Sequence, residues 1–255
     1  MTLEILTIPC LSDNYAYLAH DPATGQTAAV DVPEADPIIQ ALQSTGWTLS
    51  HVLITHHHAD HVDGLPELLA AAPATVIGAA ADAHRLPALD VAVKEGDTIT
   101  IGDDEGQVID VSGHTIGHIA IHFPRSNAVF TADSLMALGC GRVFEGTKPQ
   151  MWDSLQKLAS LPPETVVYSG HEYTQSNAKF ALTIDPGNQE LKSRASAVDT
   201  ARDKGQPTVP STLAEELATN PFLRATDPEI QRNLGMQGAD PADVFAEIRT
   251  RKDCF

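Results

Sequence analysis

Histidine and aspartate are concentrated in a short segment, residues 55–61, that reads Thr-His-His-His-Ala-Asp-His. The segment directly follows the apolar stretch 51–54, which is predicted to be a strand, and it precedes a helical pattern. His56 and His58 share one face of an extended chain because alternate residues point the same way, and His57 points to the other face. Imidazole and carboxylate groups are ligands for zinc, iron and manganese. The segment therefore predicts a metal site in preference to a solvated polar turn or a tag-like histidine run.

Three further His and Asp residues follow strand-like segments later in the chain, and these are His114, Asp133 and His171. A single histidine after a strand is more often structural than a metal ligand. The three residues share a position, however, at the end of a strand and before a loop that contains glycine. The first segment contributes four candidates of the same kind: His56, His58, Asp60 and His61. Seven ligands are too many for one tetrahedral zinc ion, but they suffice for two ions that share one carboxylate.

The composition is that of a globular protein with a strongly acidic charge. Of the 255 residues, 42% are hydrophobic and 20% are charged, which excludes wholesale disorder. Thirty-four Asp and Glu residues against sixteen Lys and Arg residues give a net charge of −18. A protein that binds nucleic acid or an anionic membrane would carry clustered Lys and Arg instead, so we expect neither partner. No apolar run approaches the roughly 18 residues that a membrane span requires.

The N-terminus and the cysteines indicate a cytoplasmic protein. The first 15 residues contain no basic segment before an apolar one, so no signal peptide is expected. Cys10, Cys140 and Cys254 are widely spaced and form no C-x-x-C motif. They are expected to be reduced thiols of a cytoplasmic protein, because a disulfide framework would need more cysteines at closer spacing.

The elements that must position the ligand candidates are short strands, which dominate the first two-thirds of the chain. Most are rich in Val, Ile and Thr and are bounded by Gly, Pro or Asp. The predicted strands are Glu4–Ile8, Tyr15–His20, Thr27–Val32, His51–Thr55, Thr75–Ala79, Thr98–Ile101, Gln107–Val111, Ile119–Phe123, Ala128–Thr131 and Val166–Ser169. Between them the spacing of apolar residues predicts helices over Asp36–Thr45, Asp63–Ala71 and Gln150–Leu161.

After residue 173 the pattern is almost entirely helical. The predicted helices there are Gln175–Ile184, Asn188–Asp203, Thr212–Ala218, Asp227–Leu234 and Pro241–Arg251. Thr212 and Glu215 have the spacing of a capping box, and Pro241 suits the first turn of a helix. We therefore expect a strand-rich α/β domain over residues 1–173 and a helical C-terminal domain over residues 174–255.

The motif H-x-H-x-D-H with a distant His, Asp and His resembles the metallo-β-lactamase superfamily, whose fold is a four-layered αβ/βα sandwich. Within it, essentially the whole chain is similar to the glyoxalase II family, the hydroxyacylglutathione hydrolases. The motifs that carry the resemblance are LSDNYAYL at 11–18, THHHADH at 55–61, GHTIGH at 113–118, GCGRVFEGT at 139–147, GHEYT at 170–174, DPGN at 185–188, PSTLAEEL at 210–217, NPFLR at 220–224 and RTRKD at 249–253. The first motif specifies only the superfamily, whereas GCGRVFEGT, GHEYT and the basic terminal segment specify the family.

The resemblance implies a particular assignment of the metal ligands. It places His56, His58 and His114 on one ion. It places Asp60, His61 and His171 on the other, with Asp133 bridging both. Asp31 matches an aspartate that supports the ligands in the family, and His20 and His118 are left as structural histidines. The two divalent ions are expected to be zinc, with iron or manganese as alternatives because they accept the same ligands.

The activity that the resemblance implies is hydrolysis of S-(2-hydroxyacyl)glutathione thioesters, with conversion of S-D-lactoylglutathione to D-lactate and glutathione. This is the second step of methylglyoxal detoxification. Asp60, His61 and Asp133 would act through a metal-bound hydroxide that attacks the thioester carbonyl. The thiol released has a pKa of about 8.5, so the thiolate can leave without a general acid. The alternative function is a glutathione persulfide dioxygenase, or another hydrolase of the metallo-β-lactamase fold.

Glutathione carries two carboxylates, so an acidic enzyme needs local cations to bind it. The resemblance assigns this role to Arg249 and Lys252, and it adds Arg142 and Tyr173 as substrate contacts. Without the resemblance, the terminal cations would be interpreted as a solvated last helical turn favoured by the helix dipole. The expected partner is a glutathione thioester bound by a monomeric protein.

Phe144 and Ala132 are two of the positions that depart from the family's usual pattern. Phe144 stands where many relatives have tyrosine, which removes one hydrogen-bond donor to glutathione. Ala132, directly before Asp133, stands where glycine is usual. Neither departure removes a predicted ligand.

Overall fold

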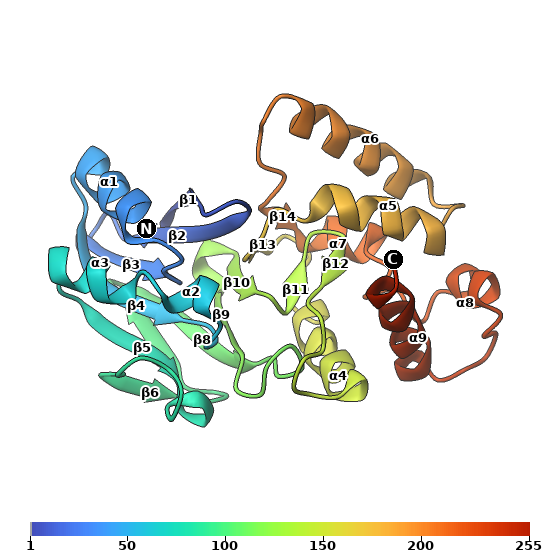
Figure 1. The fold of residues 1–255 in the computed structure, drawn as a ribbon, viewed down its shortest axis with the longest axis horizontal. Coiled ribbons are helices and arrows are strands. Elements are labelled where there is room, and N and C mark those ends of the chain that lie inside the picture. The colour runs from blue at the N-terminus through green and yellow to red at the C-terminus, as the bar shows by residue number, and fades with distance from the viewer. Residues whose placement is uncertain (1) are drawn as a thin grey trace. The chain divides into compact units, whose positions relative to one another are not determined.

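The computed structural model describes residues 2–255, which fold into two compact units (Figure 1). Unit 1 contains the residues up to 110 together with 116–131, and unit 2 contains 111–115 together with 132–255. The domain boundary predicted at residue 173 follows the change from strands to helices along the chain, and it stays a prediction.

Unit 1 contains a six-stranded sheet in the order β1-β2-β3-β4-β5-β6. Its strands are β1 (Glu4–Cys10), β2 (Asn14–His20), β3 (Gln26–Val30), β4 (Thr48–Ile54), β5 (Thr75–Ala79) and β6 (Val91–Val93). The first three strands are antiparallel, and β3 to β6 are parallel. Because the carboxyl ends of parallel strands meet at one edge of a sheet, Asp31 after β3 lies beside Thr55 after β4. The Thr55 backbone N–H donates to Asp31 Oδ1 over 2.9 Å.

Helices α1 (Ala35–Thr45) and α3 (Leu65–Ala71) pack on this sheet through their apolar faces. Ile38 and Leu68 are completely buried there. The predicted helix 63–71 begins too early, because a separate short helix α2 (Ala59–Val62) precedes α3. Gly64 lies in the gap between α2 and α3, where a Cβ atom would lie 2.8 Å from the backbone nitrogen of Ala35. This close approach to α1 requires glycine and interrupts the helix.

Unit 1 also contains four antiparallel strands in the order β7-β8-β9-β10. They are β7 (Thr98–Ile101), β8 (Asp104–Asp110), β9 (Ile119–Phe123) and β10 (Ala128–Ala132), and two 3₁₀ turns, η1 (Ala80–Asp82) and η2 (Pro124–Ser126), lie elsewhere in the unit. Phe130 of β10 packs against Tyr17 of β2, with ring centroids 5.7 Å apart. Apolar side chains of the core therefore lie between strands β1–β6 and strands β7–β10 of unit 1.

Unit 2 is mainly helical. Its helices are α4 (Lys148–Ala159), α5 (Thr174–Ile184), α6 (Gln189–Asp203), α7 (Leu213–Thr219), α8 (Pro228–Leu234) and α9 (Pro241–Asp253). Its strands form two antiparallel pairs, β11 (Leu135–Met136) with β12 (Gly139–Cys140) and β13 (Val166–Ser169) with β14 (Ser211–Thr212). Figure 1 shows α5 and α6 running side by side. Helix α4 packs against α9, where the Trp152 and Phe245 ring centroids are 5.8 Å apart.

Each of the ten predicted strands is present, with ends shifted by at most three residues. The predicted capping box is confirmed, because the Thr212 side chain accepts from the Glu215 N–H and the Glu215 side chain accepts from the Thr212 N–H. Pro241 is the first residue of α9, as predicted. The sequence did not predict β6, β11, β12 or β14, since two or three residues are too few for a periodic signal.

The three cysteines are free, and Cys10 and Cys140 are buried. Within residues 2–255, none of the helices has the length and apolar character that crossing a membrane demands.

Candidate metal centre

The four ligand candidates of unit 1 lie between the end of β4 and the end of α2. His56 and His61 are completely buried. His56 Nε2 faces His58 Nδ1 at a distance of 3.2 Å. Two ligands of one tetrahedral zinc ion, each about 2.0–2.1 Å from it, lie roughly 3.3 Å apart. The two imidazole nitrogens therefore have the separation expected of two ligands on one ion.

His57 points elsewhere. Its Nδ1 atom lies 3.2 Å from Asp82 Oδ2, and Asp82 is also bound by Arg85 at 2.9 Å. The side chain of His57 is thus engaged with a carboxylate outside the ligand group.

The tautomer of His56 is set by Thr55, a residue that sequence reasoning did not single out. The Thr55 hydroxyl donates its only proton to Asp31 Oδ2 over 2.8 Å, because a carboxylate can only accept. At the contact of 3.0 Å with His56 Nδ1, the hydroxyl must therefore accept. His56 carries its proton on Nδ1 and presents Nε2 as the ligand atom. In the sequence, only the position of Thr55 directly before the histidines indicated that it could support them.

Asp31 sets the tautomer of His61 in the same way. His61 Nδ1 donates to Asp31 Oδ2 over 2.8 Å, which leaves Nε2 as the nitrogen that can coordinate a metal. That Nε2 lies 3.8 Å from Asp60 Oδ2. Asp31 has a φ of 56°, in the left-handed region that aspartate tolerates better than most residues. In this conformation the Asp31 carboxylate contacts His61 directly and His56 through the Thr55 hydroxyl.

Asn14 is a second functional residue that the sequence did not assign. At the start of β2 and almost completely buried, its Nδ2 donates to Asp60 O over 3.0 Å and to Asp60 Oδ2 over 3.1 Å. These two bonds fix both the backbone and the carboxylate of a predicted ligand. Its place in the motif LSDNYAYL was the only signal.

The three ligand candidates of unit 2 converge on one carboxylate. Asp133 Oδ2 lies 3.2 Å from His171 Nε2 and 3.5 Å from His114 Nε2. All three side chains are at least nine-tenths buried. Asp133 and His171 are brought together because the Gly170 N–H donates to the Ala132 carbonyl over 3.0 Å, which joins the ends of β10 and β13. The Asp133 carboxylate therefore lies between the two imidazole rings.

The tautomer of His114 is also determined. Its Nδ1 donates to the carbonyl oxygen of Arg142 over 2.8 Å, because a carbonyl can only accept. Nε2 is then the atom that faces Asp133. Gly141 lies against both groups: a Cβ atom there would be 2.0 Å from the Asp133 carbonyl oxygen and 3.0 Å from His114 Nδ1. Ala132 has a φ of 41°, a conformation that favours glycine.

The remaining predicted structural histidines lie in unit 1. His118 is completely buried and stacks on His56, with ring centroids 4.6 Å apart. His20 stacks on Trp47 at 4.3 Å and its Nδ1 contacts the Thr27 hydroxyl at 2.9 Å.

The predicted substrate contacts all belong to unit 2, and Arg249 is the most deeply buried of them, with 2% of its surface exposed. Its Nη1 donates to the carbonyl oxygen of Cys140 over 2.9 Å, and its Nη2 pairs with Asp253 Oδ1 at 2.9 Å. Burial raises the pKa of the Cys140 thiol to about 11 despite the nearby guanidinium. The thiol therefore remains protonated at neutral pH.

Lys252 is half-buried one helical turn further along α9. Its Nζ lies 5.2 Å from the centroids of both Phe180 and Phe255. Burial, together with the positive charges of Arg249 and Arg142, lowers the pKa of Lys252 to about 8. The three cations are therefore close enough to repel one another. An anionic ligand bound beside them would reduce this repulsion.

Two exposed aromatic rings flank the histidines of unit 2. Tyr173 stacks on His171 with the ring planes 4° apart and the centroids at 4.6 Å. Phe144 is 61% exposed, and its ring centroid lies 5.3 Å from that of His114. Large exposed aromatic side chains next to buried polar groups are typical of ligand-binding surfaces.

The donor set fits a metal centre. In His56, His61 and His114 the Nδ1 atom contacts a hydrogen-bond acceptor, which leaves Nε2 as the atom that could coordinate a metal. Neutral imidazoles and carboxylates together suit zinc, iron and manganese. These His and Asp groups are therefore suited to a dinuclear metal site.

Comparison with known protein families matches two family models that together cover most of the chain. Residues 21–171 match the metallo-β-lactamase superfamily, and residues 172–255 match the hydroxyacylglutathione hydrolase C-terminus. Among individual proteins, the chain is 66% identical to a hydroxyacylglutathione hydrolase of Ruegeria pomeroyi over 255 residues, covering both chains completely. It is also 66% identical to a hydroxyacylglutathione hydrolase of Jannaschia sp. over 252 residues, 99% of this chain and 98% of the relative.

Solved structures share the fold. The B3 metallo-β-lactamase BLEG-1 has a TM-score of 0.67 at 19% identity and covers 86% of this chain and 99% of its own. ETHE1 from Myxococcus xanthus has a TM-score of 0.64 at 28% identity and covers 100% of this chain and 99% of its own. TTHA1623, solved in a di-iron-bound form, has a TM-score of 0.63 at 24% identity and covers 86% of this chain and 100% of its own. The predicted α/β fold of the metallo-β-lactamase type, with a helical C-terminal region, is confirmed.

Proposed function

Since the chain belongs to the hydroxyacylglutathione hydrolase family of the metallo-β-lactamase superfamily, we propose that it hydrolyses S-(2-hydroxyacyl)glutathione thioesters. The observation that carries the proposal is identity of 66% over the full length, including the family-specific region 172–255. S-D-lactoylglutathione is the proposed substrate, with D-lactate and glutathione as products. The C-terminal match favours this activity over a glutathione persulfide dioxygenase.

We propose that seven ligands hold two divalent ions, zinc in the first place and iron or manganese as alternatives. The ligands are His56, His58, Asp60, His61, His114, Asp133 and His171. Support comes from the nitrogen separation of 3.2 Å at His56 and His58, and from the convergence of two imidazoles on Asp133. Divalent cations bound there would generate a strong nucleophile from water near neutral pH and polarise the thioester carbonyl.

Neighbouring groups of the protein fix the tautomers and the orientation of the proposed ligands. Asp31 and the Arg142 carbonyl hold protons on Nδ1 of His61 and His114, so each Nε2 stays available to a cation. Asn14 orients the carboxylate of Asp60. Asp60, His61 and Asp133 are the residues proposed to act directly in the reaction, through the cations that they hold. The leaving thiolate needs no proton because its parent thiol has a pKa of about 8.5.

Recognition of glutathione is assigned to four residues of unit 2: Arg142, Tyr173, Arg249 and Lys252. We propose that Lys252 and Arg142 contact a glutathione carboxylate. Arg249 contributes positive charge from a buried position and holds the backbone of Cys140. Tyr173, which is 40% exposed and stacked on His171, offers a flat surface and a hydroxyl group. We further propose that the enzyme acts as a monomer in the cytoplasm, with residues 174–255 as its substrate-binding domain.

Loss of thioester absorbance with purified protein tests the proposal. S-D-lactoylglutathione should be hydrolysed to one equivalent of free thiol, and a chelator should abolish the reaction until zinc is restored. Glutathione persulfide with oxygen is the competing assay. Oxygen uptake without thioester hydrolysis would replace the proposed function with the dioxygenase.

A further inference from the structure

We propose that three buried side chains of the helices in unit 2 position its metal ligands. Asn177 of α5, together with Glu216 and Asn220 at α7, holds the tip of the β11–β12 hairpin. The two ends of that hairpin lead to Asp133 and to the carbonyl group of Arg142. The inference rests on the proposed function for the statement that these residues serve a metal, and it adds positioning residues that lie outside the ligand set.

The hairpin is a short ribbon with a tight turn. Leu135 pairs with Cys140, and Met136 pairs with Gly139. Leu138 in the turn has a φ of 57°, an uncommon conformation for leucine. A ribbon of two residues per strand has too few bonds to hold its own shape, so its position depends on what surrounds it.

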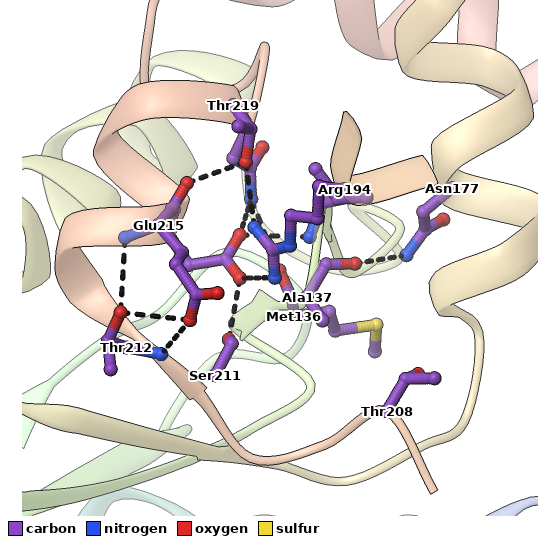
Figure 2. Close-up of polar contacts among 12 residues, drawn as sticks. Met136, Ala137, Asn177, Arg194, Thr208, Ser211, Thr212, Glu215 and Thr219 are labelled. Carbon is purple, nitrogen blue, oxygen red and sulfur yellow. Dashed lines mark hydrogen bonds and ion pairs between the residues drawn. The ribbon is translucent and has the colours of Figure 1, made fainter. Parts of the chain in front are cut away.

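Three side chains bind four backbone groups at the tip. Asn220 Nδ2 donates to the carbonyl oxygens of Met136 and Gly139, at 3.1 and 3.0 Å. Asn177 Nδ2 donates to the carbonyl oxygen of Ala137 over 3.1 Å, a bond that Figure 2 shows. Glu216 Oε2 accepts from the Leu138 N–H over 2.9 Å. These bonds hold the tip in place, since the two short strands form too few backbone hydrogen bonds with each other to do so.

Glu216 is the centre of this network. Its carboxylate is completely buried, yet it accepts four hydrogen bonds. Besides Leu138, the donors are Asn220 at 3.0 Å, Ser211 at 2.6 Å and the guanidinium of Arg194. Ser211 and Arg194 are labelled in Figure 2. The Arg194 cation balances the buried negative charge. Four hydrogen bonds hold the Glu216 carboxylate in one position. The hairpin is held in place through the bond from Leu138 to this carboxylate.

The hairpin also fits closely against α5. A Cβ atom at Gly139 would lie 2.4 Å from Asn177 Nδ2. The absence of a side chain at this position lets the hairpin approach the helix that holds it. A displacement of the tip is therefore resisted by direct contact as well as by hydrogen bonds.

The base of the hairpin contains the backbone groups that contact the predicted ligands Asp133 and His114. The Gly141 N–H donates to the Ser134 carbonyl over 3.2 Å, which closes the ribbon next to Asp133. One residue later, the Arg142 carbonyl accepts the Nδ1 proton of His114 over 2.8 Å. Only two residues separate Gly139, bound by Asn220, from Arg142. Movement of the tip therefore shifts the acceptor that determines which nitrogen of His114 faces Asp133.

The test uses Asn220→Ala, with Asn177→Ala as a milder variant that removes a single bond to the hairpin. The matched control is Asn188→Ala. Asn188 caps α6 by accepting from the Leu191 N–H at 3.1 Å, and it donates to the Ala218 carbonyl and to Asp185, both at 2.9 Å. It thus loses a comparable set of bonds in the same unit without touching the hairpin.

The first measurement is the tautomer of His114 in the metal-free protein, by ¹⁵N NMR of the imidazole ring. Wild type and Asn188→Ala should show the proton on Nδ1 alone. Asn220→Ala should show a mixture of tautomers, and Asn177→Ala a smaller change in the same direction. A folded Asn220→Ala or Asn177→Ala variant with the wild-type tautomer would overturn the proposal.

The second measurement is zinc affinity by competition with a chromophoric chelator, at a temperature where every variant is folded. Loss of an outer support of a ligand typically weakens metal binding about 10–100-fold. We expect a loss of that size for Asn220→Ala and a smaller one for Asn177→Ala, with Asn188→Ala unchanged. Equal losses in the control would show a purely structural role. If wild type bound no zinc or left the thioester intact, the proposed function would fail, while the tautomer measurement would still decide the positioning role.

Discussion

The carboxylate of Asp31 accepts the Nδ1 proton of His61 over 2.8 Å, although the two residues are separated by 30 positions in the chain. The same carboxylate accepts from the backbone and hydroxyl of Thr55. One side chain, which is not itself a predicted ligand, therefore contacts His61 directly and His56 through the Thr55 hydroxyl.

Replacement of Asp31 by asparagine should weaken metal binding. All of its partners are donors, so an amide would place its own NH₂ group against at least one donor, and one bond would be lost. We expect zinc affinity to fall about 10–100-fold, measured by chelator competition. Asp36→Asn, an exposed carboxylate in the first turn of α1, is the control and should bind zinc normally.

Asp133→Asn should remove the carboxylate on which both His114 and His171 converge. The change keeps the shape of the side chain but removes the charge that balances two divalent cations. Elemental analysis should show close to two ions per chain in the wild type and a clear loss in the variant, with turnover lost in parallel. Normal metal content with full activity would contradict the bridging role. Asp153→Asn, on the exposed face of α4, should change neither.

Lys252→Ala should raise KM for the glutathione thioester and leave kcat nearly unchanged. A hydrogen bond to a charged group contributes about 1.5–3 kcal/mol, or roughly 10–100-fold in binding. The carboxylate lies away from the thioester, so the contact should be equal in ground and transition states. A simple thioester without the tripeptide should react as before. Arg251→Ala, which removes an exposed cation from the same helix, is the matched control.

Arg249→Ala should differ from Lys252→Ala by lowering stability as well as affinity. The change leaves the Cys140 carbonyl without this donor and removes the partner of Asp253. We expect a lower Tm together with a higher KM. An unchanged Tm, or an equal loss of kcat with both thioesters, would contradict this account.

The pH dependence of KM should report the ionisation of Lys252. Its pKa is lowered to about 8, mainly by burial, so the ammonium group loses its proton as the pH rises through 8. KM for the glutathione thioester should therefore increase between pH 7 and 9, while KM for a simple thioester stays flat. Lys252→Arg keeps its charge and should remove the dependence. A rise of equal size in Lys252→Arg would assign it to another group.

The lowered pKa of Lys252 should weaken substrate binding at high pH, but it should increase the stability of the folded protein there. Between pH 8 and the usual lysine pKa of 10.5 the unfolded chain binds the proton that the folded chain has lost. The contribution of Lys252 to the free energy of unfolding should thus increase with pH over this window. Chemical denaturation of wild type and Lys252→Met should show a pH slope that only the wild type has.

Gly141→Ala should disrupt the ligands of unit 2. Its Cβ would lie 2.0 Å from the carbonyl oxygen of Asp133, so the backbone beside the ligand must move. Overpacking of this kind destabilises proteins by about 1–3 kcal/mol. We expect a lower Tm and reduced metal content. Gly187→Ala, where the added Cβ meets nothing within 4 Å, should change neither.

The sequence alone determined the types and the strand-end positions of the ligand candidates. Alternation in residues 56–58 separates His57 from its neighbours, and strand periodicity places Asp133 at the end of β10. The cap at Thr212 and the start of α9 at Pro241 were equally readable. These features depend on residues within one turn or one strand, so local physical rules suffice.

The tertiary structure decided the rest, because it depends on contacts between residues far apart in the chain. Thr55 and Asn14 support predicted ligands through pairings that no local pattern encodes. The Arg142 carbonyl reaches His114 over 28 positions, and Asn220 reaches Met136 over 84. The sequence assigned Arg249 to the substrate by its charge, and only the packing of α9 shows that its guanidinium is buried against Cys140. Backbone carbonyls and buried partners carry no residue-type signal, so only the folded chain reveals which of them the ligands use.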